Sequence, residues 1–344
     1  MGKAARVTSA DVAHRAGVST SAVSYAFNGR PGISDETRAR IHAAAKELGW
    51  RPNSAARALT GARAGLVGLV IKRPARSLGT EAFYADLIAG LQAGLQEQHV
   101  ALSLLVASDL EDELAIYREW TRDRRVDGVV LTDPRQGDAR LDLLAALGLP
   151  AVVLGNHPSP PGQAPTVWID DGAVTTSLLE YLWALGHRRI ARVSGPEKYE
   201  HTLRRTNAMA AFLAERDAAP AEVIATDYSE SEGAHAARYL LSRPAPPTAV
   251  VFDSDVLAVA GLGVAQEMGV RVPRDLSIAS FDDSAMARLV RPRLTTMSRD
   301  TVEFGERAAR LLLRQLDADG PVASEPGPVV TLSVRDSTAP PAAR

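Results

Sequence analysis

The sequence predicts a small all-α unit at the N-terminus, followed by an α/β body of two doubly wound lobes. Three observations lead to this fold class. The first 50 residues contain three short helical patterns with capping signals. From Gly65 onward, short buried apolar runs alternate with amphipathic segments, the pattern of parallel sheets covered by helices. The chain has 344 residues, 46% of them hydrophobic, which is too long for one typical domain and ample for a large core.

A helix-turn-helix occupies residues 8 to 28. Thr8 stands three residues before Asp11, the spacing at which an N-cap hydroxyl and a returning carboxylate satisfy each other's backbone amides. Gly17 can adopt the left-handed conformation that ends this helix, and Ser19 can cap the next one. Two helices joined by a glycine can also simply turn a corner in an α protein, so the following segments decide between these interpretations.

The second helix presents an uncharged polar face. It runs to about Phe27, and Val23 and Phe27 point inward. The outward positions are Thr20, Ser21, Ser24 and Tyr25. A major groove can receive a helix with such a face.

A third helix and a conditional fourth one follow. Ser34 caps a helix that has Ile41 in its apolar stripe and Gly49 at its end. Pro52 can start a further helix and Gly61 can end it. Such a segment, about seven residues long, is too short for a stable isolated helix. We therefore expect coil in the free protein and helix only against a partner.

Three segments of the N-terminal part carry a family resemblance. They are the run 7–27, the loop Asn28-Gly29-Arg30-Pro31-Gly32-Ile33-Ser34, and Arg51-Pro52-Asn53 followed by Ala55-Ala56-Arg57 and Leu59. Together they resemble the helix-turn-helix headpiece and hinge helix of the lactose-repressor (LacI/GalR) family. The resemblance implies DNA contacts at Thr20, Ser21 and Tyr25 on bases, at Ser24 and Asn28 on phosphate, and at Asn53, Ala56 and Leu59 in the hinge.

Leu59 and Tyr25 are the two informative positions of this DNA-binding part. An apolar side chain at the end of a short, binding-dependent helix can insert between base steps and kink the duplex, as the hinge leucine of the family does. The alternative for Leu59 is a linker leucine that rests on the body. Tyr25 stands where several relatives carry arginine, and tyrosine cannot make the bidentate contact of arginine with guanine. The base preference of relatives therefore does not transfer to this chain.

Charge and composition exclude several classes of protein. Residues 1–60 carry an excess of five positive charges and the remainder an excess of seven negative charges, and a basic N-terminal part suits contact with phosphates. The chain contains no cysteine. It shows no secretion signal and no apolar run of about 20 residues, so we expect a cytoplasmic protein without membrane contact. No cofactor and no metal are expected.

The body divides into two sets of strands and helices. The expected strands span 66–71, 101–107, 126–131 and 151–154 in the first set and 190–194, 223–226, 249–252 and 276–281 in the second. The expected helices span 80–97, 111–124, 139–147 and 301–316, with others starting near 171, 201, 229 and 254. Residues 291–297 return the chain to the first lobe, and 329–334 form a last strand. Ligands of such sheets bind outside the carboxyl ends of the strands, which define a cleft here.

These patterns give approximate domain boundaries. The headpiece spans 1–51, the hinge helix and linker 52–64, and the effector-binding and dimerisation domain 65–337. Its first lobe comprises about 65–167 and 297–328, and its second about 168–296 and 329–337. Residues 338–344 are expected to be disordered.

Four motifs connect the body to the same family. Gly186-His187-Arg188-Arg189-Ile190, Asp253-Ser254-Asp255, Phe281-Asp282-Asp283 and Pro292-Arg293-Leu294-Thr295-Thr296 match landmarks of its periplasmic-binding-protein-like effector domain. The resemblance, which covers essentially the whole chain, implies a cleft for a small molecule, commonly a sugar or a nucleobase, and a homodimer.

The resemblance also implies effector-binding residues. Arg205 occupies the place of the family's effector-binding arginine, and a guanidinium can chelate paired hydroxyls or a carboxylate. Asp282 follows a strand and can accept hydrogen bonds from sugar hydroxyls. The other candidates are the aromatic residues Phe83, Tyr84 and Tyr228 and the cleft positions Tyr199, His201 and Ser254. A solvated arginine and aromatic rings packed inside a lobe are the alternatives.

Two departures from the family leave the chemistry of the effector open. Asn156 stands where many relatives have an aspartate, and Lys72 and Arg73 place two cations after the first strand. A neutral sugar, a phosphorylated or acidic sugar and other ligands all remain compatible with these changes.

The sequence thus predicts a ligand-responsive transcriptional repressor. Its effector, a sugar or derivative, changes affinity for palindromic double-stranded operator DNA through the hinge helix. The alternatives are an activator of the same family and a small-molecule-binding module without a DNA role. A transport-associated solute-binding protein needs an export signal and has no use for residues 1–61. An enzyme is disfavoured, because Gly261-Leu262-Gly263 lies within an expected helix and lacks the third glycine of a dinucleotide loop.

Overall fold

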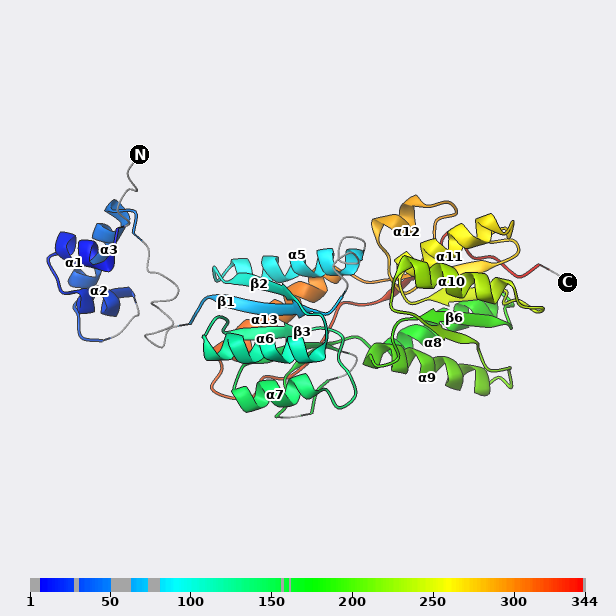
Figure 1. The fold of residues 1–344 in the computed structure, drawn as a ribbon, viewed down its shortest axis with the longest axis horizontal. Coiled ribbons are helices and arrows are strands. Elements are labelled where there is room, and N and C mark those ends of the chain that lie inside the picture. Colours follow the sequence, from blue (N-terminus) through cyan, green and yellow to red (C-terminus); the bar gives the residue numbers. More distant parts are fainter. Residues whose placement is uncertain are drawn as a thin grey trace. The chain divides into compact units, whose positions relative to one another are not determined.

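The structure is a computed structural model that describes residues 7–27, 31–50, 63–73, 81–155, 158–160 and 162–342. The chain forms two compact units (Figure 1). One contains the N-terminal helices up to Leu66 together with residues 120–127, and the other contains most of two α/β lobes. Within the described ranges, no helix is long and apolar enough to cross a membrane.

Among the described residues up to Trp50, the chain forms the helices α1 (Ser9–Ala16), α2 (Thr20–Phe27) and α3 (Asp35–Glu47). The predicted capping box is confirmed, because the Thr8 amide donates to the Asp11 carboxylate at 2.7 Å and the Asp11 amide donates to the Thr8 hydroxyl. Gly17 ends α1 with φ of 66°. The Ser19 hydroxyl accepts a hydrogen bond from the amide of Ala22 in the first turn of α2. Val12, Val23 and Ile41 lie at the centre of the shared core.

The first lobe is a six-stranded sheet in the order β11-β5-β4-β3-β1-β2. Its strands are β1 (Leu66–Ile71), β2 (Ala101–Val106), β3 (Gly128–Leu131), β4 (Ala151–Gly155), β5 (Thr166–Trp168) and β11 (Glu325–Pro326). Its helices are α5 (Ala82–Gln96), α6 (Leu110–Arg122), α7 (Ala139–Leu147) and α13 (Thr301–Asp317). Figure 1 shows α5 and α13 on one side of this sheet and α6 and α7 on the other.

The second lobe repeats this plan in the order β12-β10-β9-β8-β6-β7. Its strands are β6 (Ile190–Ser194), β7 (Val223–Ala225), β8 (Ala249–Phe252), β9 (Ser277–Ser280), β10 (Thr295–Ser298) and β12 (Thr331–Ser333). Its helices are α8 (Asp171–Ala184), α9 (Glu200–Ala214), α10 (Glu230–Leu241), α11 (Asp255–Glu267) and the short α12 (Ala285–Leu289). Helices α8 and α9 cover one side of the sheet, and α10 and α11 cover the other.

The observed elements differ from the expected ones at the lobe boundary. Residues expected to be a crossing segment form β10, which pairs in parallel with β9, so the chain leaves the second sheet after Ser298. Two short strands, β5 and β11, and the short helix α12 were not expected. Each has five residues or fewer, which is too short to produce a recognisable periodicity.

The C-terminal segment also differs from the expectation of disorder. The Thr338 hydroxyl lies 2.7 Å from that of Tyr181, and the Ala339 amide donates to Ser277 at 3.1 Å. The carbonyl of Ala339 lies 3.0 Å from Nε2 of His187. These hydrogen bonds fix residues 338 and 339 on the second lobe, which composition alone could not show.

Helices α5 and α13 approach each other through glycines. A Cβ on Gly90 would lie 2.0 Å from the carbonyl oxygen of Val302, and a Cβ on Gly305 would lie 2.5 Å from that of Leu87. Backbone on both sides of the contact therefore excludes any side chain. This contact fixes α5 at the edge of the cleft described below.

We predict that Gly90→Ala destabilises the protein by about 1–3 kcal/mol, because the added methyl group overlaps backbone that cannot move aside. Gly263→Ala in α11 is the matched control, since its Cβ meets nothing within 4 Å. This control is expected to be neutral or to stabilise by about 0.5–1 kcal/mol. Chemical denaturation of both variants checks the prediction, and equal effects would contradict it.

Candidate functional site

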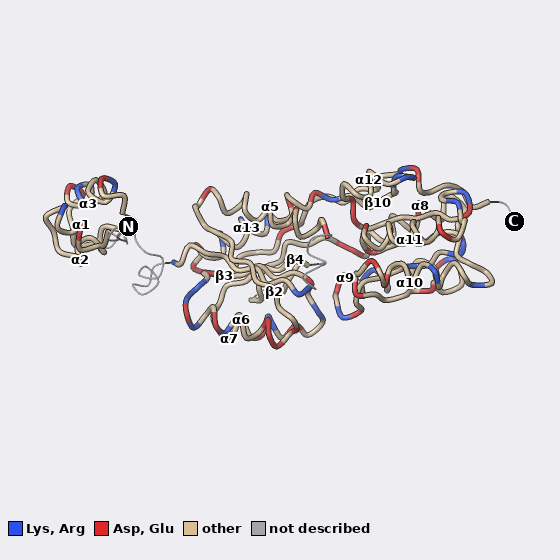
Figure 2. Tube along the Cα trace, turned by 45° about the horizontal axis from the view of Figure 1, so that its top comes forward, with Lys and Arg blue, Asp and Glu red and all other residues tan. Residues whose placement is uncertain are grey.

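Four of the eight candidate DNA-contacting residues lie on α2. Thr20, Ser21 and Tyr25 are exposed, Tyr25 to 38%, and Ser24 is half-buried. No residue of α2 is charged, whereas α3 carries both acidic and basic residues (Figure 2). The predicted contacts at Asn28, Asn53, Ala56 and Leu59 lie outside the described residues.

Two arginines of α3 serve the fold of this unit. Arg38 donates to the carbonyl of Ala26 at 3.0 Å, and Arg40 donates to that of Ala16 at the same distance. Both carbonyls lie at helix C-termini, where a cation satisfies unpaired oxygens and the helix dipole. These two guanidiniums therefore make their contacts within the N-terminal unit itself.

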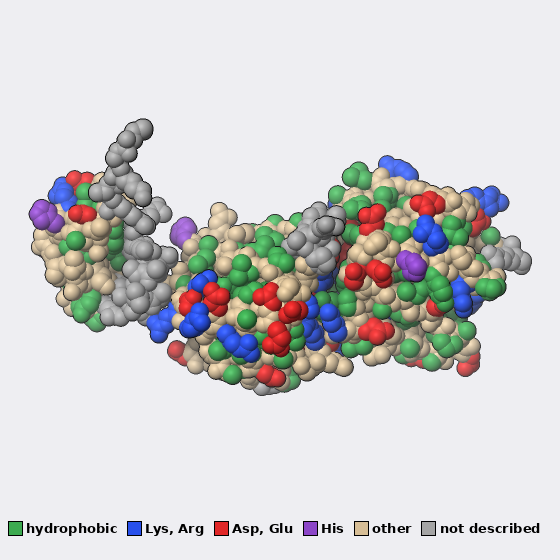
Figure 3. Space-filling view, viewed as in Figure 1, with side chains coloured by type: hydrophobic (Ala, Val, Ile, Leu, Met, Phe, Trp, Pro, Cys, Tyr) green, Lys and Arg blue, Asp and Glu red, His purple; other side chains and the backbone are tan. Residues whose placement is uncertain are grey.

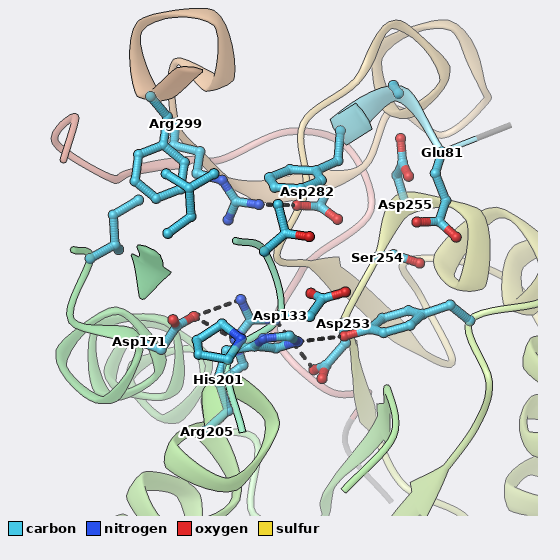
Figure 4. Close-up of a pocket in the computed structure, with 18 of the residues that line it drawn as sticks. Glu81, Asp133, Asp171, His201, Arg205, Asp253, Ser254, Asp255, Asp282 and Arg299 are labelled. Atoms are coloured by element: carbon cyan, nitrogen blue, oxygen red, sulfur yellow. Dashed lines mark hydrogen bonds and ion pairs between the residues drawn. The ribbon is translucent and has the colours of Figure 1, made fainter. Parts of the chain in front are cut away.

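A cavity lies between the two lobes, where the strands of both sheets end (Figure 4). Arg73 follows β1, Asp133 follows β3, Asp253 follows β8 and Asp282 follows β9. Parallel strands that end at the same edge of a sheet bring these side chains together. The ionisable residues that line the cavity are Arg73, Glu81, Asp133, Asp171, His201, Arg205, Asp253, Asp255, Asp282 and Arg299.

Arg73 is compensated by two carboxylates of the first lobe. Its Nε lies 3.2 Å from Glu81 and its Nη1 lies 2.7 Å from Asp133. The same Nη1 donates to the hydroxyl of Tyr199, in the second lobe, at 3.1 Å. Burial raises the pKa of Glu81 from 4.5 to about 7, with repulsion from Asp133 adding to burial and attraction by Arg73 opposing it.

Arg205 is the centre of a second buried network. Its Nε donates to Asp171 at 2.7 Å, while its Nη1 lies 3.8 Å from Asp253, beyond hydrogen-bond distance. Asp253 is itself bound by Arg192 through two contacts of 2.7 Å. Burial opposes ionisation of Asp253, but Arg192 and Arg205 outweigh it and lower its pKa.

His201 and Tyr228 form a neutral pair beside Arg205. Nε2 of His201 lies 2.9 Å from the hydroxyl of Tyr228. Burial, together with the charge of Arg205, lowers the pKa of His201 from 6.5 to about 4, so the imidazole is uncharged at neutral pH. Gly195 makes room for the Tyr228 ring, because a Cβ there would lie 2.0 Å from its Cζ.

Asp282 lines the cavity together with Arg299. One of its carboxylate oxygens accepts a hydrogen bond from Arg299 at 2.9 Å, and the guanidinium of Arg299 lies 5.2 Å from the centre of the Phe83 ring. Burial raises the pKa of Asp282 from 3.8 to about 6; repulsion from Asp255 adds to this effect and Arg299 opposes it. Ser254 caps α11 by accepting from the amide of Leu257.

Six of the eight predicted effector-binding residues line this cavity: Phe83, His201, Arg205, Tyr228, Ser254 and Asp282. Tyr84 does not, because it is 1% exposed in the core of the first lobe and donates its hydroxyl to Asp133. Tyr199 does not either; it is buried behind Arg73 and lines a separate outer groove. Both residues position cleft side chains instead of forming the cavity wall.

Several lining residues were not among the predicted effector contacts: Arg73, Glu81, Asp133, Asp171, Asp253, Asp255 and Arg299. Asp253 and Arg299 directly follow strands, and Arg73, Asp133, Asp171 and Asp255 come two or three residues after one. This position could have identified them. The sequence interpretation considered Arg73 and Lys72 only as a source of positive charge. Lys72 in fact lines the outer groove with Lys198 and Tyr199, and Figure 3 shows basic side chains where the two lobes meet.

A helix-turn-helix unit followed by a two-lobed cleft domain defines a DNA-binding regulator with a ligand-binding body. Residues 8–53 match the family described as bacterial regulatory proteins, lacI family, and residues 179–338 match a periplasmic binding protein-like domain. The HTH-type transcriptional regulator AglR of Rhizobium meliloti (strain 1021) is 32% identical, over 94% of this chain and 92% of its own length.

Two solved structures extend the comparison. A complex of the transcriptional regulator CelR with cellobiose is 30% identical with a TM-score of 0.73, over 96% of this chain and 100% of that one. The lac repressor dimer bound to operator and the anti-inducer ONPF is 26% identical with a TM-score of 0.78, over 97% and 99%. The chain therefore belongs to the lacI family of bacterial regulatory proteins and is a DNA-binding transcriptional regulator. Its relatives are regulators, not enzymes.

We predict that Glu81→Gln makes the protein more thermostable at about pH 8 and changes little at about pH 5. The pKa of Glu81 rises on folding from 4.5 to about 7, so the ionised carboxylate destabilises the folded state progressively as pH increases through this window. Glutamine removes that cost and still accepts from Arg73. Melting temperatures across this pH range check the prediction, with the exposed Glu232→Gln as control. A larger gain at low pH would contradict it.

Proposed function

We propose that this regulator is a repressor whose affinity for operator DNA is controlled by a carbohydrate-type effector in the cleft. The observation that carries the proposal is the placement of Arg205 and Asp282 on one cavity between the lobes. A planar donor and a carboxylate acceptor that line the same cavity suit adjacent hydroxyl groups. The rings of Phe83 and Tyr228 supply apolar surface for the C–H face of a sugar.

Arg205 has donor capacity for a ligand. Its Nε and Nη2 both contact one oxygen of Asp171, whereas Nη1 is too far from Asp253 for a hydrogen bond. The guanidinium is also fixed in orientation, lying 4.1 Å from the centre of the Phe281 ring. A donor fixed before binding loses little side-chain entropy when a ligand arrives.

Two relatives support the nature of the ligand and the output. The structure of CelR contains cellobiose, and the lac repressor structure contains operator DNA and an anti-inducer. Both align with more than nine-tenths of this chain. We infer the same general class of effector and a repressing output here.

Coupling between ligand and DNA follows from contacts that join the lobes. The amide of Glu200 donates to the carbonyl of Pro134 at 2.8 Å, and Arg73 reaches Tyr199. A ligand between the lobes changes the free energy of this closed arrangement. If the same arrangement of the lobes also orders the hinge at 52–64, effector binding and DNA binding are linked. The effector then changes the affinity for DNA by the same factor by which DNA changes the affinity for the effector.

We propose that the protein acts as a homodimer on a palindromic operator. Strand β2 is an outer strand of the first sheet, and Leu104, Leu105 and Val106 on it are exposed. Apolar side chains on an edge strand suit a second copy of the chain. The lac repressor, a dimer on its operator, supports this arrangement. Each α2 then enters one major groove, with Thr20, Ser21 and Tyr25 toward bases.

A thermal-shift screen against sugars, sugar phosphates and nucleosides identifies the effector, because a ligand of the folded body raises its melting temperature. We predict that Arg205→Lys removes most of the shift, since lysine lacks the planar pair of donors. Arg204→Lys, the neighbouring residue on α9 and half-exposed, is the matched control and keeps the shift. An unchanged shift in Arg205→Lys would place the ligand elsewhere.

We also predict that Leu59→Ala weakens specific operator binding while effector binding stays unchanged, because alanine is too short to wedge between base steps. The expected loss is about tenfold or more, the cost of one large buried contact of about 1.4 kcal/mol or more. Fluorescence anisotropy at fixed salt measures it, with Thr60→Ala as a control in the same segment. Equal operator affinity in wild type and Leu59→Ala refutes the wedge.

A further inference from the structure

Acidic side chains outnumber basic ones around the cavity. The lining carboxylates are Glu81, Asp133, Asp171, Asp253, Asp255 and Asp282, and the lining guanidiniums are Arg73, Arg205 and Arg299. Arg73 contacts Glu81 and Asp133, Arg205 contacts Asp171, and Arg299 contacts Asp282. His201 contributes no charge at neutral pH. Even with Arg192 behind Asp253, the guanidiniums do not neutralise all the carboxylates.

Two carboxylate oxygens in this cavity are buried without a hydrogen-bond donor among the described residues. They are Oε1 of Glu81 and Oδ2 of Asp255. The Glu81 side chain is 10% exposed and Asp255 is 3% exposed. Asp255 has no ion pair with any described arginine or lysine, and its other oxygen accepts only from the amide of Val256. Buried carboxylate oxygens without donors are costly, so a donor from outside the chain is favoured at this place.

The two oxygens belong to one wall of the cavity. Glu81 immediately precedes α5 in the first lobe, and Asp255 is the first residue of α11 in the second. In the close-up of Figure 4, both carboxylates lie on the same side of the cavity, with that of Asp282 toward its centre. The charge of Asp282 raises the pKa of Glu81, and the charge of Asp255 raises that of Asp282. Asp282 thus repels Glu81 and is itself repelled by Asp255 across a shared space.

We propose that the effector carries a protonated amino group, bound between Glu81 and Asp255 and facing Asp282, so that the ligand class is an amino sugar. This inference rests on the proposed function of the cleft. An ammonium group supplies up to three donors and one positive charge, so it pairs the free oxygens and cancels their repulsion. A hydroxyl supplies one donor and leaves the repulsion in place.

Other occupants fit this wall less well. A phosphate or carboxylate on the ligand would add negative charge where the carboxylates already outnumber the guanidiniums. Lys72, which could attract an anion, lines the outer groove instead of the cavity. No group of acidic or histidine side chains with the geometry of a metal site occurs among the described residues.

Three disaccharides with the same β-1,4-linked glucose skeleton test the proposal. They are the disaccharide of two glucosamines, its di-N-acetylated form, which retains the nitrogen without the charge, and cellobiose. Calorimetry with the full-length protein near neutral pH is expected to give an affinity for the diamine about tenfold or more above that for the other two, the worth of one charge-assisted contact. Glucosamine beside glucose repeats the comparison for a single ring.

Matched variants test the location of the amine. Glu81→Gln and Asp255→Asn are each expected to reduce diamine affinity about tenfold while changing cellobiose affinity less than about threefold. Asp142→Asn, an exposed carboxylate on α7, is the control for net charge and is expected to change neither. Melting curves of the free variants verify that each is folded, so a loss of binding is not a loss of structure.

The outcomes separate this proposal from the function it rests on. Cellobiose binding as tightly as the diamine overturns the amine and keeps a carbohydrate cleft. Diamine binding that is unaffected in both variants overturns its placement at Glu81 and Asp255. If the broader screen finds only a neutral or anionic effector whose shift is lost in Arg205→Lys, the proposed function stands and the amino sugar is rejected. A protein that no amino sugar stabilises rejects it as well.

Discussion

Compensation of buried charge is the constraint on which the cleft depends. Arg73 and Arg205 both lie in the interior between the lobes, and an isolated buried ion costs several kcal/mol. Arg73 therefore requires Asp133, and Arg205 requires Asp171, each at hydrogen-bond distance. These partners follow or precede different strands and helices, so the electrostatics of the cleft fix the relative positions of the sheet ends.

The same constraint ties the cleft to the arrangement of the lobes. Arg73 belongs to the first lobe, yet the Nη1 that contacts Asp133 also donates to Tyr199 of the second. Separating the lobes would expose this guanidinium to water and break the contact between Glu200 and Pro134. A ligand that adds charge or hydrogen bonds at this place acts on the free energy of lobe closure directly. No long relay of side chains is needed between ligand and lobe movement.

The sequence predicts those features of the structure that depend on neighbouring residues better than those that depend on contacts between distant segments. Strands β1 and β8 match their predicted bounds, because a parallel strand buried on both faces is a continuous apolar run. Strand β6 also matches its predicted bounds, although Arg192 and Ser194 interrupt its apolar residues. Arg205 and Asp282 were identified from the family resemblance. Tyr84 was predicted as a ligand contact but is a core residue. The rotation of α5 about its axis decides whether Phe83 or Tyr84 faces the cavity. This rotation depends on tertiary packing at Gly90, which the local sequence does not show.

The charge of the cleft shows the limit of local inference most clearly. The sequence places two consecutive cations, Lys72 and Arg73, after the first strand, and this pair was compatible with an anionic effector. In the fold only Arg73 lines the cavity between the lobes, whereas both side chains line the outer groove. Arg73 enters a space already occupied by Glu81 and Asp133, and Lys72 lines the outer groove. The net charge of a binding site is set by residues that the fold brings together from distant segments of the chain. In this cavity the net charge of the lining side chains is negative.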